Sequence, residues 1–324
     1  MRKSLTRRDF LKASAAAPVA LAAASASRTK ALPPKSTWKK ALIVNEPKED
    51  ELRQIMEAGF DGVATRAADM STTQAAKARK MAENMGMRIH SVRRGWMNFN
   101  SGDKAAIQKS YEQVKRSLRA AQAIGGNSIL MIPCRIGGMK MPKAWEFDVE
   151  FDPETGHLKR VVKGDNAPYS DYIKAHNYAT DASKEAIKRL IPVAKKCGVV
   201  MGIENVWNNL WVTPELFQNF IASFDSKWVQ TTYDIGNHVK YAPPEDFVKA
   251  LGPLIYKVDV KDFKLNPDGH GGKFIAIREG SVNWPKVMQC LHEVDYHGWM
   301  TIEGRHGLSV DELSRRLDLI LSGK

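Results

Sequence analysis

Four acidic residues stand near the ends of predicted β-strands in the second half of the chain. Glu204 lies in "GIENVWNN", Asp234 in "TYDIGNH", Asp259 in "KVDVKDF" and Glu303 in "MTIEGRHG". Subtracting their numbers gives intervals of 30, 25 and 44 residues, and each interval has room for one strand–helix unit. Because the carboxyl ends of neighbouring barrel strands converge on one mouth, we expect these four carboxylates to meet there.

Carboxylates that are crowded into one pocket repel each other and raise each other's pKa. A divalent cation removes this conflict, since carboxylate oxygens are good ligands for Mg²⁺ and Mn²⁺. Any one of these acids, taken singly, could instead cap a strand end or pair with a basic side chain. For four acids at successive strand ends, the pattern favours a metal site formed by Glu204, Asp234, Asp259 and Glu303.

The stretch "KVDVKDF" shows how charged residues fit such a strand. Side chains alternate between the two faces of a strand. Val258 and Val260 are therefore expected to face the helices, while Asp259 and Lys261 face the barrel interior. Lys261 would neutralise a carboxylate or hold a substrate hydroxyl, and a salt bridge inside the barrel is the alternative interpretation.

One alternating pattern of short β-branched runs and helical stretches provides the elements that position these residues. The predicted strands are 41–44, 62–65, 88–92, 128–133, 199–205, 229–234, 255–261 and 299–303, and the predicted helices are 48–58, 72–85, 103–124, 177–197, 213–224, 244–252, 283–293 and 309–321. Eight repeats predict an α/β protein with a single (β/α)8 TIM barrel over residues 38–324.

Residues 135–176 stand where a short loop would be expected after the fourth strand. Within them, "WEFDVEFDPETGHLKRVV" alternates on both sides of a turn at 152–156, which predicts an inserted hairpin. The hairpin follows the carboxyl end of a strand and so belongs to the same face as the acids. It would serve as a lid over the site or as a contact between subunits.

Composition is typical of a globular protein with a sizeable core. The 324 residues are 43% hydrophobic and carry a formal charge of +13. No basic run is interleaved with aromatic residues, so we interpret the charge as a solvated basic surface and expect no nucleic-acid partner. The three cysteines, Cys134, Cys197 and Cys290, are widely spaced and odd in number, which predicts no disulfide framework.

The N-terminus resembles a bacterial twin-arginine export signal. The segment "SLTRRDFLKASAAAPVALAAASA" has paired arginines, an alanine-rich apolar stretch and an A-x-A cleavage motif at 24–26. We therefore expect a signal peptide over 1–26, a linker over 27–37, and a periplasmic protein without stable membrane insertion after cleavage. A fortuitous arginine pair and an uncleaved anchor are the alternatives. The twin-arginine route carries folded proteins, which suits a protein that takes up its metal in the cytoplasm.

From about residue 40 onward the chain resembles the xylose isomerase-like TIM barrel superfamily, the sugar phosphate isomerase/epimerase family. The matching phrases are "EAGFDGV", "IENVWNN", "YDIGN", "VKDF", "REGSVNW" and "YHGWMTIEG". The resemblance implies a metal held by glutamate, aspartate, histidine and glutamate from strands five to eight. Glu204, Asp234 and Glu303 match this pattern, whereas Asp259 stands where histidine is usual and Ala64 replaces an acid.

The replacement of histidine by Asp259 changes the chemistry that the resemblance implies. An all-oxygen site favours harder ions, so Mn²⁺ is our expected cofactor, with Mg²⁺, Co²⁺ or Zn²⁺ as alternatives. Alternatively, Asp259 does not bind the metal, which would leave a site with three ligands.

The resemblance further implies enediolate chemistry on a sugar. Glu204 and Glu303 would exchange a proton from opposite faces of the substrate while the metal stabilises the enediolate. The expected function is a divalent-metal-dependent isomerase or epimerase, and export argues against a phosphorylated substrate. We expect a non-phosphorylated sugar or keto-sugar. A 3-keto-glycoside lyase or deglycosidase is the alternative, and an endonuclease IV-like hydrolase and a non-catalytic sugar-binding barrel rank lower.

A further set of residues is expected to contact a small-molecule carbohydrate at the barrel mouth. They are two residues assigned to the end of strand three, an aromatic wall, and polar groups after strands six to eight: His90, Arg93, Trp207, His238, Lys261 and Arg305. Each has a structural alternative, in packing or in a salt bridge. A homodimer or homotetramer is the assembly expected for barrels of this kind.

Overall fold

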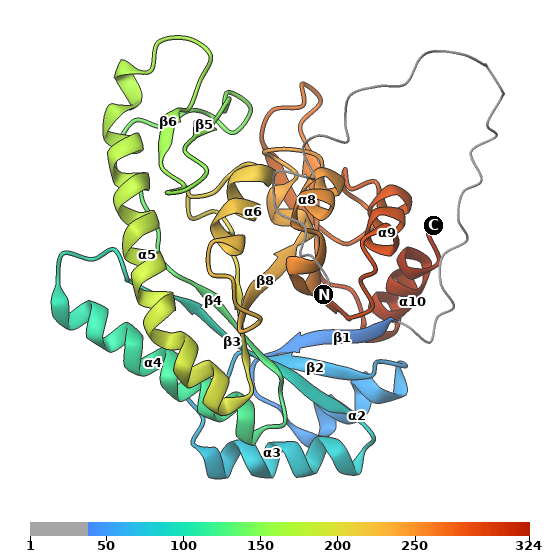
Figure 1. The fold of residues 1–324 in the computed structure, drawn as a ribbon. Helices are drawn as coiled ribbons and strands as arrows, with labels where there is room; N and C mark the ends of the chain where they lie inside the picture. The colour runs from blue at the N-terminus through green and yellow to red at the C-terminus, as the bar shows by residue number, and fades with distance from the viewer. Residues whose placement is uncertain (1–37) are drawn as a thin grey trace, which may run out of the picture. The chain divides into compact units, whose positions relative to one another are not determined.

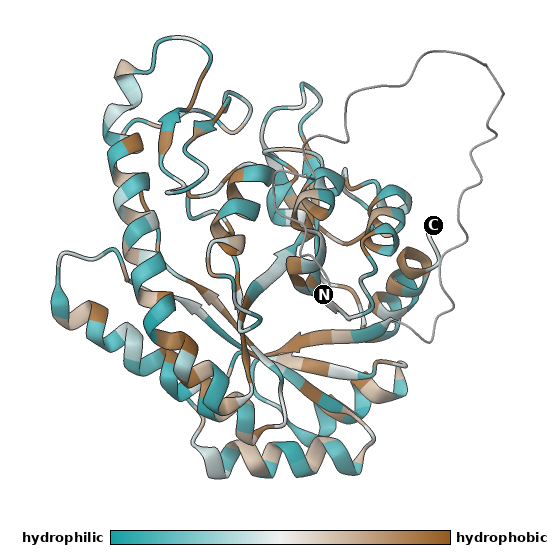
Figure 2. Cartoon of the chain, viewed as in Figure 1, coloured by the Kyte–Doolittle hydropathy of each residue, from teal (hydrophilic) through white to brown (hydrophobic). Residues whose placement is uncertain are grey.

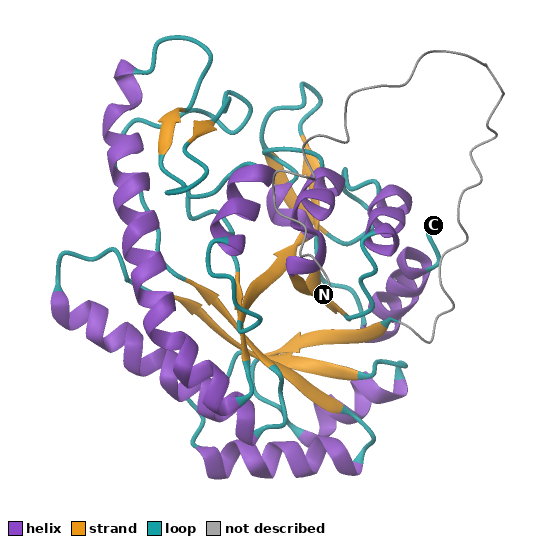
Figure 3. Cartoon of the chain, viewed as in Figure 1, coloured by secondary structure: helices purple, strands orange, loops and turns teal. Residues whose placement is uncertain are grey.

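Eight parallel strands form a closed barrel in the computed structural model, which describes residues 38–324. Their order around the barrel is β1-β12-β9-β8-β7-β4-β3-β2, and helices surround the strands (Figure 1, Figure 3). The predicted single (β/α)8 barrel is therefore confirmed. The predicted export segment (1–26) and linker (27–37) lie outside the described residues. No helix between residues 38 and 324 is long and apolar enough to cross a membrane.

The barrel strands coincide closely with the predicted β-branched runs. They are β1 (Lys39–Val44), β2 (Gly62–Thr65), β3 (Arg88–Trp96), β4 (Ser128–Ile132), β7 (Val200–Ile203), β8 (Val229–Asp234), β9 (Ile255–Val260) and β12 (Trp299–Ile302).

The helices follow the strands around the chain. They are α2 (Glu49–Glu57), α3 (Thr72–Asn84), α4 (Lys104–Ala123), α5 (Ser170–Cys197), α6 (Pro214–Ala222), the single turn α7 (Ile235–His238), α8 (Pro244–Leu251), α9 (Trp284–Glu293) and α10 (Val310–Leu321), with 3-10 turns η2 (Ala167–Tyr169) and η3 (Gly252–Leu254).

The core lies between the strands and the inner faces of these helices. In α10, Leu313, Leu317 and Ile320 are buried at helical spacing, which is the pattern of an amphipathic helix on a sheet. In Figure 2, apolar residues colour the barrel strands while polar residues dominate the outer helix faces. The predicted start of α6 is also present: the Thr213 side chain accepts a hydrogen bond from the Leu216 N–H, and Pro214 opens the helix.

Strand β3 is longer and less regular than predicted. It continues past Val92 to Trp96, because its final residues pair with β4. Its register shifts beside Val63 and Ala64 of β2 and again between Arg93 and Gly95 opposite β4. Such irregularities break the strict alternation of faces. As a result, His90 and Arg93, three residues apart, both contact side chains of β9 through the barrel interior.

The segment after β4 differs from the prediction at its far end. Helix α5, predicted over 177–197, begins seven residues earlier, at Ser170. Before it, β5 (Glu150–Phe151) and β6 (Leu158–Arg160) pair antiparallel. The Asn177 side chain fixes this small sheet to α5 by accepting from the Leu158 N–H at 2.7 Å.

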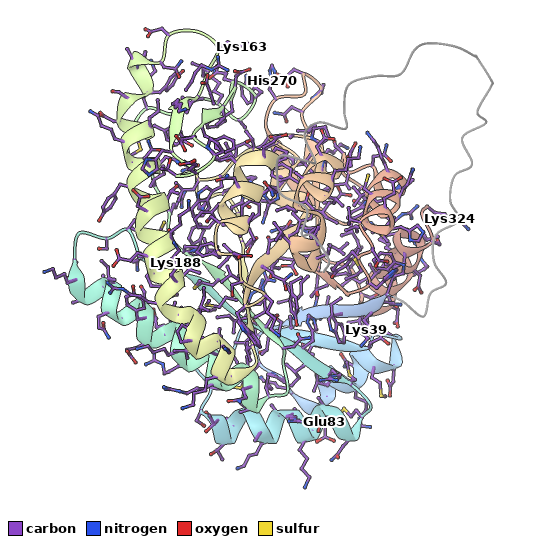
Figure 4. All side chains as sticks on the ribbon, viewed as in Figure 1. Lys39, Glu83, Lys163, Lys188, His270 and Lys324 are labelled. Atoms are coloured by element: carbon purple, nitrogen blue, oxygen red, sulfur yellow. The ribbon has the colours of Figure 1, made fainter. Side chains whose placement is uncertain are left out.

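A second small sheet, which the prediction had treated as loop, follows β9. Strands β10 (Asp262–Leu265) and β11 (Gly272–Ile275) pair antiparallel. The connecting loop reaches the segment after β4, where Trp145 stacks on His270 with ring centroids 4.3 Å apart. Lys163 of that segment and His270 lie at the same end of the view in Figure 4. Two loops far apart in sequence therefore meet beyond the carboxyl ends of the strands.

Candidate active site and metal centre

Three of the four predicted carboxylates meet at the mouth of the barrel. Glu204 follows β7, Asp234 ends β8 and Glu303 follows β12. One oxygen from each lies within 4.8 Å of the others. The Glu204 N–H donates to the Met131 carbonyl and the Glu303 N–H to the Val260 carbonyl. These bonds extend the strand ladders by one residue and so fix where both side chains start.

Asn237 connects two of these acids. Its N–H donates to Asp234 Oδ1 at 2.9 Å, where Asp234 caps the short helix α7. Its side-chain Nδ2 donates to Glu204 Oε1 at 2.7 Å. The next residue, His238, turns away from the acids: its ring nitrogens lie 2.8 Å from the Asp234 carbonyl oxygen and 2.6 Å from Asn205 Oδ1. His238 is buried and supports the loops behind the acids.

Asp259 lies outside the group of three and is held by Arg93. The Arg93 guanidinium bonds Asp259 Oδ2 through Nη1 and reaches Glu303 Oε2 at 3.0 Å through Nη2. Lys261 Nζ lies 3.4 Å from Asp234 Oδ2 and 3.7 Å from Glu303 Oε2. Asp259 and Lys261 thus face the barrel interior, and Lys261 makes the salt bridge that was one of its two interpretations.

Burial and charge set the three acids to different states. Burial raises the pKa of Glu204 well above its usual range, and the charges of Glu303 and Asp234 raise it further. Burial also raises the pKa of Asp234 to about 7. Burial opposes ionisation of Glu303 as well, but Arg93 and Lys261 outweigh it and bring its pKa to about 2.

The donor set fits a divalent cation. All the candidate ligand atoms are carboxylate oxygens, which suit hard cations. Four ionised acids beside Arg93 and Lys261 leave a net charge of −2, which one divalent ion would balance. Glu204 and Asp234 are 3% and 0% exposed, so without such a charge their ionisation is costly. The three-carboxylate group is therefore the candidate metal centre of the described chain.

His90 does not join the acids, which corrects its placement at a strand end. It is 2% exposed, and its ring stacks on Trp299 with centroids 4.1 Å apart. Lys257 Nζ lies 2.5 Å from its Nδ1 and donates to its carbonyl oxygen. Burial lowers the pKa of both side chains. The pair packs one layer below Asp259, since 257, 259 and 261 alternate onto the same face of β9.

Arg305 is not brought to the acids either. Its guanidinium lies 2.6 Å from Glu51 of α2 and is 41% exposed. Gly304, with a φ of +87°, precedes it and turns the chain after Glu303. A different arginine that the sequence interpretation missed, Arg66, reaches Glu303 Oε1 at 3.5 Å. Arg66 directly follows β2, and its position at a strand end was the available signal.

Trp207 lies in the loop after β7, where it contacts α7 and β11. Its Nε1 donates to the Asn237 carbonyl at 2.9 Å. Its ring stacks on Phe274 of β11 with centroids 4.9 Å apart, and Lys240 Nζ lies 3.6 Å from its centroid. Phe274 and Lys240 were missed by the sequence interpretation, because neither their loops nor their partners show a periodic pattern.

Comparison with known proteins agrees with this architecture. The family described as "Xylose isomerase-like TIM barrel" matches residues 52–318. An uncharacterized protein of Methanocaldococcus jannaschii is 28% identical over 144 residues, which are 43% of this chain and 46% of that protein. The match thus spans less than half of that relative's length.

Two solved structures share the fold at low sequence identity. A 3-keto-D-glucoside 4-epimerase from E. coli has a TM-score of 0.63 and 14% identity, covering 87% of this chain and 98% of that one. A xylose isomerase-like TIM barrel protein from Mycobacterium smegmatis, in complex with magnesium, has a TM-score of 0.58 and 19% identity, covering 85% and 87%. At these identities the likeness establishes the fold.

Proposed function

The chain belongs to the xylose isomerase-like TIM barrel family, and from that premise we propose that it is a divalent-metal-dependent sugar isomerase or epimerase. The observation that carries this proposal is the meeting of Glu204, Asp234 and Glu303 within 4.8 Å at the barrel mouth. The substrate we propose is a non-phosphorylated sugar or keto-sugar. The epimerase named among the solved structures of this fold supports the same class of reaction.

Glu204, Asp234 and Glu303 would hold the cation, for which we propose Mn²⁺. A divalent ion at that position supplies Lewis-acid polarisation of a carbonyl next to the carbon that loses its proton. We propose that Asp259 is not a ligand, because Arg93 already occupies its Oδ2. Arg93 and Lys261 would then bind oxygen atoms of the sugar beside the acids, as expected for strong donors that face a shared pocket.

The proton chemistry follows from the unequal states of the two glutamates. Glu303, with a pKa of about 2, is ionised at neutral pH, so it is the group that can accept a proton from the sugar. Glu204, whose pKa is raised by burial, binds a proton more readily than Glu303 does, so we propose that it returns the proton to the sugar; as a ligand of the cation it would otherwise be ionised. The two residues follow strands β7 and β12, which are not neighbours in the barrel, so they approach a bound sugar from different sides. This placement suits removal and return of a proton on opposite faces.

A lyase or deglycosidase acting on 3-keto-glycosides is the second candidate. The specific observation in its favour is the extent of the mouth beyond the acids. Trp207 stacks on Phe274 of β11, and Trp145 stacks on His270 in the loop between β10 and β11. A second ring or an aglycone would lie against these residues. The same loss of a proton would then expel a leaving group.

Metal analysis followed by incubation in D₂O tests the proposal. The purified protein should hold about one divalent ion per chain, and free sugars or 3-keto-glycosides should take up deuterium. Inverted configuration indicates epimerisation, and aglycone release indicates the lyase. A metal-free protein that exchanges no proton with any of these sugars would refute both candidates.

The variant Glu303→Gln should abolish proton exchange, because an amide cannot accept the proton. The matched control is Glu279→Gln, on an exposed residue that pairs with Arg316 away from the acids. Full exchange in Glu303→Gln would refute the role assigned to this glutamate.

A further inference from the structure

We propose that the sugar substrate is anionic, and that Lys240 and Arg135 bind its carboxylate beside Trp207 at the barrel mouth. This inference rests on the proposed function, since it assigns the substrate class of the same pocket. The observation behind it is a pair of basic side chains that have aromatic neighbours but no acidic partner in the part of the chain that the structure describes.

The two residues lie on loops that follow nearby strands at the same end of the barrel. Arg135 follows β4, Trp207 follows β7 and Lys240 follows β8, and these strands are neighbours in the barrel. The loops that carry them are joined by backbone and side-chain bonds: the Ile136 N–H donates to the Asn208 carbonyl at 3.2 Å, and Asn209 Nδ2 donates to the Ile136 carbonyl at 2.8 Å. The arrangement is therefore built into the loops.

Direct contacts connect these loops to the acids. Lys261, which pairs with Asp234 and Glu303, has its Nζ 4.4 Å from the Phe274 ring centroid. Phe274 stacks on Trp207, and Trp207 carries Lys240 Nζ at 3.6 Å. A sugar that places one carbon beside Glu303 can therefore extend along these side chains toward Lys240.

Neither cation has a carboxylate partner among residues 38–324. The Lys240 ammonium lies over the rings of Trp207 and Tyr241, the second with its centroid 4.8 Å away. The Arg135 guanidinium lies 5.9 Å from the ring centroid of Trp96, which is 45% exposed at the end of β3. Cation–π contacts compensate only part of the lost hydration of an ammonium group.

The local electrostatics favour an anion at this position. Burial, with a smaller contribution from the Arg135 charge, lowers the pKa of Lys240 to about 8. An anion bound between the two side chains would raise the pKa of Lys240 again, because it supplies the missing counter-charge. A hydroxyl group would supply a hydrogen bond but no charge. The acids beneath do not repel such a ligand once a divalent ion balances their charge of −2.

A carboxylate is the anion that agrees with the proposed export of the protein, since a sugar acid needs no phosphorylation. The predicted ligand class is a sugar whose ring carries a carboxylate at a carbon remote from the reacting one. A phosphate ester would offer similar oxygens, so the experiment includes one.

Calorimetric titration of the Mn²⁺-loaded full chain tests the inference without requiring turnover. The ligands are matched pairs, D-glucose with D-glucuronate, D-galactose with D-galacturonate and D-mannose with D-mannuronate, together with D-glucose 6-phosphate. We expect at least one uronate to bind about tenfold more tightly than its neutral partner. The preference should weaken with added salt and as the pH rises from 7 to 9, because Lys240 then loses its charge.

Lys240→Met should remove this preference, and Lys240→Arg should retain most of it. The matched control is Lys227→Met, since Lys227 Nζ also lies over a tryptophan, 5.1 Å from the Trp228 centroid, but outside the mouth. If only the phosphate ester gains affinity through Lys240, the assigned carboxylate is wrong, and so is the proposal of a non-phosphorylated substrate.

Equal affinity for acidic and neutral sugars, or an unchanged preference in Lys240→Met, would overturn the inference. The proposed function is separately measured by deuterium uptake. If neutral sugars take up deuterium and acidic sugars bind no more tightly, the inference is wrong but the proposed reaction is not. If acidic sugars bind more tightly but no sugar takes up deuterium, the proposed reaction is wrong but the inference is not.

Discussion

Arg93 bonds Asp259 and Glu303 from the opposite side of the barrel, and this contact determines what Asp259 does. A carboxylate that replaces a family histidine could be a fourth ligand or a structural partner. One Asp259 oxygen is bonded to the guanidinium and Asp259 is 2% exposed, so it already has a cationic partner, which offsets part of the effect of burial on its pKa. We therefore propose that Asp259 positions Arg93, which in turn orients Glu303.

Asp259→Asn separates these two interpretations. If Asp259 only positions Arg93, the variant should keep its Mn²⁺ affinity within about threefold, while proton exchange falls by about ten- to a hundredfold, the usual cost of losing a residue that orients a ligand. Titration calorimetry and deuterium uptake measure the two effects.

Asp234→Asn is the matched comparison, because Asp234 belongs to the three-carboxylate group. It should lose Mn²⁺ affinity by about a hundredfold or more. Equal losses of Mn²⁺ affinity in both variants would show that Asp259 is a ligand.

The positions of the acids could be predicted from the sequence, but the basic side chains that pair with them could not. Strand-end position and alternation place Glu204, Asp234 and Glu303, because backbone geometry alone decides where those side chains point. Arg93 and Arg94 look equivalent in sequence, yet Arg93 enters the barrel while Arg94 bonds Asp69 outside it, at 2.6 and 2.9 Å. Which of the two arginines faces the barrel interior depends on the register shifts of β3, and no residue pattern predicts them.

At the scale of elements, one buried acid ties the β10–β11 hairpin to the loop before α9 and to the start of that helix. Asp262 is 0% exposed and accepts hydrogen bonds from the N–H groups of Phe263, Arg278, Gly280 and Val282 and from Trp284 Nε1. A Cβ at Gly280 would lie 2.0 Å from Asp262 Oδ1, so the loop needs glycine there. The hairpin and the start of α9 thus share one acceptor.

Asp262→Ala should lower the free energy of unfolding by about 3 kcal/mol, because it leaves several buried donors unpaired. Amide hydrogen exchange should also rise over residues 276–284. The control is Asp268→Ala at the exposed tip of the same hairpin, which should change the unfolding free energy by less than about 0.5 kcal/mol. Chemical denaturation of both variants measures the difference, and similar losses would contradict the assigned anchor.

The elements outside the regular repeat were the hardest to predict. The periodic strands and helices of the barrel follow from alternation and amphipathic spacing. The start of α5 at Ser170 was missed, because Tyr172 in its first turns contacts loop residues: its ring lies against Phe147, and its hydroxyl donates to the Asn209 carbonyl. The β10–β11 pairing was missed because its four residue pairs lie within a glycine-rich stretch that reads as loop.

At the scale of the whole molecule, the buried acids make stability depend on both pH and metal. The pKa of Asp234 is raised from 3.8 to about 7. Its contribution to stability is therefore fully present below pH 3.8 and is lost as the pH rises through 7. Glu303 has the opposite sign: its pKa of about 2 gives a contribution that is present above pH 4.5 and lost as the pH falls toward 2.

Added Mn²⁺ should consequently raise the melting temperature more at pH 7.5 than at pH 5. At pH 5 a proton on Asp234 competes with the ion, whereas at pH 7.5 the ion compensates ionised acids. Thermal unfolding at each pH, with Mn²⁺ and in buffer free of divalent ions, measures the shift in melting temperature. A shift that is independent of pH would contradict the assignment of Asp234 as a ligand.

Export through the twin-arginine route stays a prediction, as does a homodimer or homotetramer. The first is checked by expressing the full chain and sequencing the N-terminus of the periplasmic protein, which should begin after Ala26. Replacing Arg7 and Arg8 by lysine should retain the protein in the cytoplasm. Sedimentation of the mature chain checks the second.

The two register shifts of β3 make the pocket sensitive to the gain or loss of a single codon. A one-residue deletion between them would exchange Arg93 and Arg94 between the inner and outer faces while leaving the composition of the strand almost unchanged. A deletion of this kind between related chains changes the spacing of residues in the strand but not their types, so the percentage of identical residues does not reveal it. Gap placement in this strand therefore decides whether an arginine in a related barrel is compared with its functional or its structural counterpart.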